Sequence, residues 1–80
     1  MQVEVRLFAT LAEGVRGVKV SEPFDVELPD SATVGALIEQ LGIDPGDVHL
    51  VMIDGRVVHD RNRPLAGALR VGLFPPVGGG

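Results

Sequence analysis

The chain has 80 residues, no Cys, and eleven acidic against seven basic side chains, so its net charge is -4 at pH 7. This length fits one small domain, and without a disulfide or a thiolate metal site its apolar content of 45% must supply the core. The acidic balance argues against nucleic acid or an anionic membrane as a partner, and any sulfur chemistry must use a group other than a thiol.

The first residues predict a strand with one covered face, because apolar and polar residues alternate from Val3 to Leu7. This register places Phe8 on the polar side of the strand, together with Glu4 and Arg6. The stretch lacks the basic region and apolar run of a signal peptide, and no segment has the length of a membrane span. We therefore expect a cytoplasmic protein. Ala9–Glu13 is predicted to form a short helical turn that ends at Gly14.

A second strand is predicted to begin at Val18 or at Phe24 and to reach Leu28, before a turn over residues 29–31. Thr33 is then a suitable N-cap for a helix that ends at Gly42. The spacing of i, i+3, i+4 and i+7 places four apolar side chains on one face of this helix: Val34, Leu37, Ile38 and Leu41.

The second half of the chain predicts three more strands. Residues 44–47 read as a loop, residues 50–53 as a short apolar strand, and Asp54-Gly55 as a hairpin turn into a strand over residues 56–59. An irregular crossing over residues 60–67 leads to a final strand over residues 69–74. The order of strand, strand, helix and three strands predicts an α+β fold of the β-grasp (ubiquitin-like) type, in which one helix covers a mixed sheet.

The first and last strands lie side by side at the centre of the sheet in such a fold. The registers then place Phe8 and Phe74 on the outer face, away from the helix, and Met52 joins them there. Apolar side chains grouped on an exposed face are typical of a docking surface. The alternative is that they are ordinary single exposed residues.

The end of the chain is predicted to leave the domain. Pro75 and Pro76 fix φ and supply no backbone donor, so the last strand stops before them, and Gly78, Gly79 and Gly80 have no side chains to pack. We predict a β-grasp domain over residues 1–74 and a flexible glycine-rich tail over residues 75–80. The terminal carboxylate of Gly80 is then the candidate functional group.

Five segments together resemble the MoaD-like sulfur carriers, the small subunits of molybdopterin synthase in the MoaD/ThiS ubiquitin-like superfamily. They are Val5-Arg6-Leu7-Phe8-Ala9-Thr10-Leu11, Leu28-Pro29-Asp30, Ala32-Thr33-Val34, Arg63-Pro64-Leu65 and Phe74-Pro75-Pro76-Val77-Gly78-Gly79. The resemblance covers nearly the whole chain, and the strand followed by Phe-Pro-Pro-Val and glycines is its most specific part.

The resemblance implies a carrier without catalytic activity or bound cofactor of its own. An E1-like adenylyltransferase would use ATP to adenylate Gly80, whose carboxylate would become a thiocarboxylate, and the large subunit of molybdopterin synthase would direct that sulfur into molybdopterin. By position, Gly79 precedes the acceptor. The positions matching partner contacts, including the tail that enters the partner, are Phe8, Met52, Val57, Phe74, Pro75, Pro76, Val77 and Gly78.

Two departures from this family leave the pathway open. Ala66-Gly67-Ala68 replaces the usual Asp-Gly-Asp turn, and the tail has three glycines where the family commonly has a variable residue and two. The Val-Gly-Gly-Gly ending also resembles the thiamine-pathway carriers, although these generally lack the Phe-Pro-Pro motif. A thiamine-thiazole carrier, a tungsten-cofactor carrier and a ubiquitin-like tag or interaction module are therefore the alternatives.

No other cluster in the sequence indicates a site. The potential metal ligands have no compact spacing, and we interpret them as surface residues: His49, Asp54, His59 and Asp60. Four arginines are interpreted as solvated, the alternative being contact with an anionic partner: Arg56, Arg61, Arg63 and Arg70.

Overall fold

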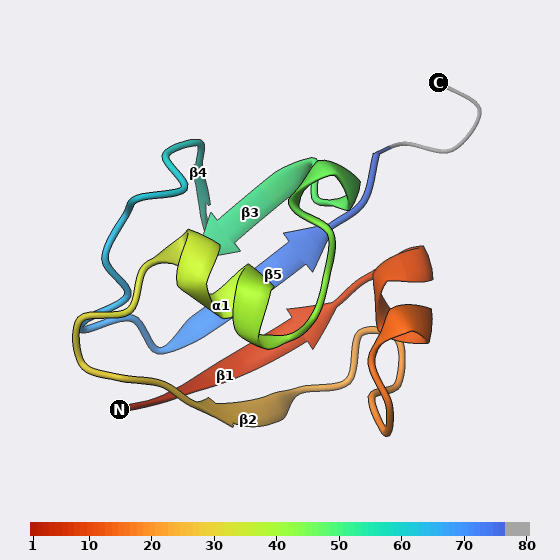
Figure 1. Ribbon diagram of the computed structural model, residues 1–80, viewed down its shortest axis with the longest axis horizontal. Helices are drawn as coiled ribbons and strands as arrows, with labels where there is room; N and C mark the ends of the chain where they lie inside the picture. The colour runs from red at the N-terminus through yellow and green to blue at the C-terminus, as the bar shows by residue number, and fades with distance from the viewer. Residues whose placement is uncertain (77–80) are drawn as a thin grey trace.

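The computed structural model describes residues 1–76, which form five strands, one α-helix and two short 3-10 helices (Figure 1). The strands are β1 (Gln2–Leu7), β2 (Phe24–Glu27), β3 (Leu50–Ile53), β4 (Arg56–Val58) and β5 (Arg70–Phe74). The helices are η1 (Ala9–Gly14), α1 (Val34–Gln40) and η2 (Pro45–Asp47).

The five strands form one mixed sheet in the order β2-β1-β5-β3-β4. The first and last strands of the chain are parallel neighbours at its centre, and the other neighbouring pairs are antiparallel. Helix α1 lies across one face of this sheet (Figure 1). The predicted α+β, β-grasp arrangement is thereby confirmed, and the opposite face of the sheet, called the outer face below, is the one that α1 leaves uncovered.

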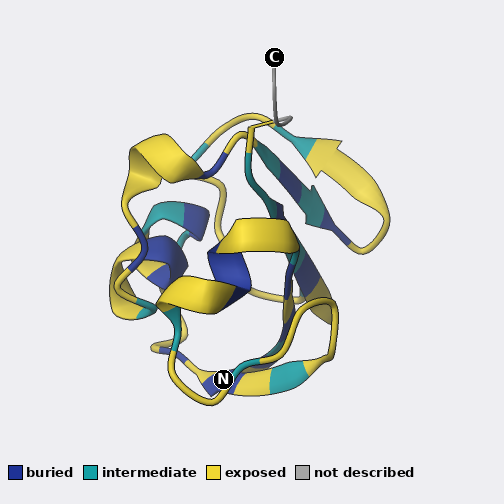
Figure 2. Cartoon of the chain, turned by 90° about the vertical axis from the view of Figure 1, so that its right-hand side faces the viewer, coloured by how far each residue is buried: buried dark blue, intermediate teal, exposed yellow. Residues whose placement is uncertain are grey.

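The core fills the space between the sheet and α1. Val34, Leu37 and Ile38 are almost fully buried, as the helical spacing predicted, and Figure 2 shows that the turns of the helix facing away from the sheet are exposed. Alternate residues of the two central strands meet them from the sheet: Val3, Val5, Leu7, Val71 and Leu73. Because side chains alternate across a strand, this assignment also fixes which residues point to the outer face.

Both ends of α1 have the predicted caps. The Thr33 hydroxyl oxygen accepts a hydrogen bond from the Ala36 backbone N–H at 3.2 Å, and Gly42 follows the helix with a φ of +74°. The crossing segment completes the N-terminus, because the carbonyl oxygens of Arg61 and Arg63 accept hydrogen bonds from the first two N–H groups of the helix.

Several boundaries differ from those predicted. The later start of the second strand, at Phe24, is confirmed, but β2 ends at Glu27 and β4 ends at Val58, one residue before each predicted end. The predicted loop over residues 44–47 contains η2, whose N-cap Asp44 accepts a hydrogen bond from the Gly46 backbone N–H. Pro45 at the first position favours such a turn because its φ is already helical.

The crossing over residues 60–67 is more closely integrated than its irregular sequence indicated. Leu65 is fully buried in the core. The interpretation of Arg61 as solvated is wrong, because its Nη2 donates a hydrogen bond to the Val48 carbonyl oxygen at 2.7 Å in a partly buried position. This contact ties the crossing to the segment that leads into β3.

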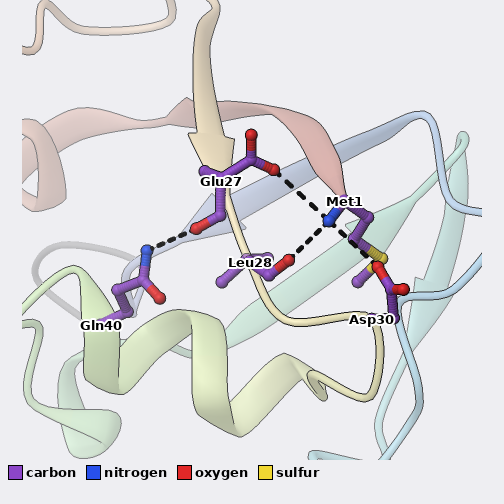
Figure 3. Close-up of polar contacts among 5 residues, drawn as sticks. All are labelled: Met1, Glu27, Leu28, Asp30 and Gln40. Carbon is purple, nitrogen blue, oxygen red and sulfur yellow. Dashed lines mark hydrogen bonds and ion pairs between the residues drawn. The ribbon is translucent and has the colours of Figure 1, made fainter.

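The start of β1 is held to the end of β2 by polar contacts (Figure 3). The Met1 ammonium donates to the Leu28 carbonyl oxygen at 2.7 Å and to Asp30 Oδ1 at 3.2 Å, and it lies 3.4 Å from Glu27 Oε2. The hydrogen bond with Asp30 raises the pKa of the ammonium above its ordinary value of 8.0; Glu27 adds to this effect and desolvation opposes it. Gln40 Nε2 also donates to the Glu27 carbonyl oxygen, so α1 is tied to the same edge strand.

Within residues 1–76, no helix has the length and apolar character needed to cross a membrane.

Candidate functional site

The centre of the outer face carries a stacked aromatic pair, Phe8 and Phe74. Their ring centroids are 4.2 Å apart and the ring planes differ by 5°. The pair forms because β1 and β5 are parallel neighbours in which Leu7 lies opposite Leu73. Phe8 and Phe74 directly follow these two residues, so they lie beside each other on the outer face. The Phe8 N–H donates to the Leu73 carbonyl oxygen at 3.1 Å, which continues the pairing one residue beyond β1. Both phenylalanines are half-buried.

A row of outward-pointing positions crosses four strands beside this pair. Arg6 of β1 lies opposite Gly72 of β5, Gly72 lies opposite Met52 of β3, and Met52 lies opposite Val57 of β4. Met52 is half-buried and Val57 is 48% exposed. The sequence-predicted residues Phe8, Met52 and Phe74 therefore come together on one face, with Val57 at its edge.

A hollow of about 170 Å³ lies in this face, and it is lined by Arg6, Phe8, Met52, Arg70, Gly72 and Phe74 among others. A Cβ atom added at Gly72 would lie 3.3 Å from a ring carbon of Phe74 and 3.4 Å from a ring carbon of Phe8. Sequence reasoning missed Gly72, although its position between the inward-facing Val71 and Leu73 was a usable signal. The aromatic pair thus rests over a position that has no side chain.

The charged residues lining the hollow are both basic. Arg6 has one weak ion pair, in which its Nε lies 4.0 Å from Glu4 Oε2, and both side chains are more than one-third exposed. The Arg70 side chain makes no ion pair or hydrogen bond with any residue in the described part of the chain. Arg70 is exposed, as the interpretation of a solvated side chain expects, and it lies at the rim of the hollow.

The strand that carries the site is anchored at both ends. Asp54 and Gly55 have φ values of +50° and +84°, which confirms the predicted hairpin turn, and Asp54 Oδ1 accepts hydrogen bonds from the N–H groups of Leu69 and Arg70. At the other end, the His49 N–H donates to the Phe74 carbonyl oxygen at 2.8 Å. Asp54 is therefore a structural residue that spacing in the sequence could not reveal.

The chain leaves the sheet directly after the aromatic pair. Pro75 is half-buried and Pro76 is exposed, and neither belongs to a strand. The other tail residues named as site candidates lie outside the described residues: Val77, Gly78, Gly79 and Gly80. Among residues 1–76, no three His, Asp or Glu side chains are grouped so as to hold a metal ion.

Sequence comparison provides the identification. Residues 5–80 match the model of the ThiS family, a span that includes the second half of β1, the whole of β5 and the glycines at the end of the sequence. The chain belongs to the ThiS family. No curated protein matches it significantly.

Solved structures agree with this membership. SAMP1 from Haloferax volcanii has 26% sequence identity and a TM-score of 0.70, with 100% of both chains covered. A protein from Pyrococcus furiosus, provisionally named molybdopterin converting factor, subunit 1, has 28% identity and a TM-score of 0.69 over 96% of this chain and 99% of that one. A further structure of the Haloferax volcanii small archaeal modifier protein 1 has 26% identity and a TM-score of 0.65, covering 95% of this chain and 98% of that one.

The predicted membership of the MoaD/ThiS ubiquitin-like sulfur carriers is confirmed. Members of this family are small carrier proteins rather than enzymes, which agrees with the prediction of a chain without catalytic machinery of its own.

Proposed function

We propose that this ThiS-family chain carries sulfur for the synthesis of molybdopterin, and that the aromatic pair of Phe8 and Phe74 is where its partner enzymes dock. The observation that carries the proposal is the position of this pair at the point where β5 ends and the segment toward Gly80 begins. A partner bound to this pair would have its active site within reach of the C-terminal carboxylate. The proposed partners are an E1-like adenylyltransferase and the large subunit of molybdopterin synthase.

The proposed chemistry takes place on Gly80 within the partner. A carboxylate is a poor electrophile, so a carboxylate oxygen first attacks the α-phosphorus of ATP and pyrophosphate leaves. Hydrosulfide supplied by the partner system then attacks the carbonyl carbon, AMP leaves, and a thiocarboxylate remains; a persulfide would first give an acyl disulfide, which a thiol of the partner system would cleave to the thiocarboxylate and a disulfide. Donors in the partner must approach the carbonyl closely to stabilise the oxyanion, and Gly79 and Gly80 present no side chain to prevent this approach. The chain has no Cys, so the carboxylate is the proposed sulfur acceptor.

Two observations favour the molybdopterin pathway within the carrier family. The Phe74-Pro75-Pro76-Val77 segment resembles the MoaD-like carriers, and the Pyrococcus furiosus protein, similar over 96% of this chain, bears the name of a molybdopterin converting factor. The alternative of a thiamine-thiazole carrier follows from the third terminal glycine. Supplying the gene to strains deleted for either carrier separates the two, because only the correct pathway will be restored.

The carrier role is tested by mass spectrometry of the intact protein. After incubation with ATP, the E1-like enzyme of the same genome and a sulfur donor, we expect a mass gain equal to the replacement of one oxygen by sulfur, mapped to Gly80. A protein lacking Gly79 and Gly80 is the control and should gain nothing. No gain, or a gain at another residue, would exclude the proposed function.

A second candidate is a protein modifier, because SAMP1 is similar over the whole of both chains. A modifier would form an isopeptide bond between the Gly80 carboxylate and a lysine amine of a target, using the same adenylate. Incubation with a lysate and ATP distinguishes the two roles. A conjugate containing a Gly80–lysine link would support modification, whereas the thiocarboxylate without conjugates would support sulfur transfer.

A further inference from the structure

The chain carries few groups that could capture an activated carboxylate. It has no Cys, and Lys19 is its single lysine, the other six basic residues being arginines. A guanidinium stays protonated in proteins, and a hydroxyl is a weak nucleophile without an adjacent base. An imidazole that takes up an acyl group loses it again to water. The stable acyl acceptors are therefore two amines, that of Lys19 and the α-amine of Met1.

The Met1 amine is held in its protonated form. An α-amine is ordinarily the least basic amine of a protein and hence the most reactive at neutral pH. Here it donates to the Leu28 carbonyl oxygen at 2.7 Å and to Asp30 Oδ1 at 3.2 Å. The hydrogen bond with Asp30 raises its pKa, so less of it is the free amine at neutral pH. The start of β1 also lies at the opposite end of the sheet from the end of β5 (Figure 1).

Lys19 lies at the end of the sheet where the chain leaves it. The residue is exposed and belongs to the loop between η1 and β2. The Ser21 N–H donates to the Leu7 carbonyl oxygen at 2.8 Å, which ties this loop to the last residue of β1. Leu7 lies opposite Leu73 and the two strands are parallel, so the loop and the end of β5 occupy the same end of the sheet (Figure 1).

The chain beyond β5 is long enough to bring Gly80 to Lys19. Lys19 lies two residues before Ser21, whose hydrogen bond reaches Leu7. One strand spacing then separates Leu7 from Leu73, so the Cα atoms of Lys19 and Leu73 are at most about 19 Å apart. The seven residues that follow Leu73 span up to about 23 Å. Two groups joined by such a short connection meet at an effective concentration on the order of millimolar, which exceeds that of a second copy in a dilute solution.

We propose that Lys19 is a self-modification site, whose amine captures the activated carboxylate of Gly80 in the same chain when no sulfur reaches it. The Lys19 Nζ attacks the carbonyl carbon of the Gly80 adenylate, the bond to AMP breaks, and a proton passes to water. The product is an isopeptide bond that closes the chain into a ring. A closed chain has lost the carboxylate that sulfur would enter, so closure withdraws carriers that are activated without a sulfur supply. The inference rests on the proposed function, because it requires the adenylate of Gly80.

The test incubates the full chain with ATP and the E1-like enzyme of the same genome, without a sulfur donor. We expect intact-mass spectrometry to show a monomer that has lost one water, and peptide mapping to find Gly80 joined to Lys19. Lys19→Arg keeps the charge but removes the nucleophile, so it should abolish this product while ATP–pyrophosphate exchange continues as in the wild type. Adding Arg16→Lys to that variant should restore closure, now at position 16, because Arg16 is an exposed residue of the same loop.

A mixture of isotope-labelled and unlabelled chains separates closure within one chain from linkage between two copies. The linked peptides should carry a single label state, and added hydrosulfide should replace the closed chain by the thiocarboxylate. Peptides of mixed label, a link to Met1, or a loss of water that persists in Lys19→Arg would overturn the proposal. An unchanged monomer mass in the wild type while ATP–pyrophosphate exchange proceeds would also overturn it and leave the proposed function intact. Absence of exchange would contradict the proposed function itself, and the assignment of Lys19 would fail with it.

Discussion

A double-mutant cycle on the aromatic pair separates its contribution to stability from its contribution to docking. Both rings are half-buried and stacked at 4.2 Å, so truncating either to Ala removes its packing on the outer face of the sheet and the whole stacking interaction. Full burial would make Phe→Ala cost about 3–5 kcal/mol; for half-buried rings we expect about 1–2 kcal/mol each. The pairwise coupling should be about 0.5–1.5 kcal/mol, the range measured for aromatic pairs.

Urea unfolding at equilibrium measures these quantities. For a small domain with an m-value of about 1 kcal/mol/M, each single substitution should lower the midpoint by about 1–2 M. The double variant Phe8→Ala with Phe74→Ala should lose less than the sum of the two. Because both rings lie at the centre of the proposed docking surface, each single substitution should also weaken binding to the activating enzyme by roughly 10–30-fold.

Phe24 supplies the control, since it is the third phenylalanine of the chain and packs against the core from β2. Phe24→Ala should lower stability, should be additive with Phe8→Ala, and should leave the affinity of the folded protein unchanged. Coupling below about 0.3 kcal/mol between Phe8 and Phe74 would show that the rings do not stack in solution. Unchanged affinity in Phe8→Ala would refute the assignment of the docking surface.

Three further predictions concern the parts of the fold that support the site. Asp54→Asn tolerates the positive φ but loses the carboxylate that accepts hydrogen bonds from the N–H groups of Leu69 and Arg70, so it should lower the free energy of unfolding by about 1 kcal/mol. Asp54→Ala should lower it more. Equal losses for the two variants in thermal or urea unfolding would contradict this reasoning. The pKa of the Met1 ammonium is raised above 8.0, so the contribution of this group to stability should be complete below pH 8 and should be lost as the pH rises through the higher folded pKa. Over that pH range the urea midpoint of the wild type should therefore fall more than that of Asp30→Asn. Plots of midpoint against pH that run parallel for the two proteins would refute the contact. Leu65→Ala should cost about 2–4 kcal/mol, measured by the same unfolding assay, and a cost below about 1 kcal/mol would show that the crossing segment does not close the core.

The sequence predicted the faces of the central strands because a period of two leaves little freedom. Once Val71 and Leu73 are inward, Phe74 must be outward, and the same argument applies to Phe8 after Leu7. The grouping of Phe8, Met52 and Phe74 therefore followed from alternation and from the expected strand order alone. The helix was equally predictable, because its apolar stripe and both caps are local in sequence.

Other features of the site depend on contacts between distant residues. The hollow is lined by residues of different strands, and only the pairing register places Arg6 and Met52 on either side of Gly72. The hydrogen bonds of Asp54 are made with residues that lie 15 and 16 positions further along the chain, so no local sequence pattern indicates them. The burial of Leu65 was missed for a related reason, since an irregular segment has no periodicity from which to infer a buried face.

The two faces of β5 have different surroundings, because one faces the core and the other belongs to the outer face. Its inward residues, Val71 and Leu73, are almost completely buried in the core, and its outward residues, Gly72 and Phe74, belong to the proposed docking surface. The inward contacts fix the strand at the centre of the sheet, and they therefore also fix the position from which the chain continues toward Gly80. A side chain at position 72 would meet the aromatic pair, because an added Cβ would lie 3.3 Å from a ring carbon of Phe74 and 3.4 Å from one of Phe8. The glycine therefore lets the rings of Phe8 and Phe74 pack closely on the central strand.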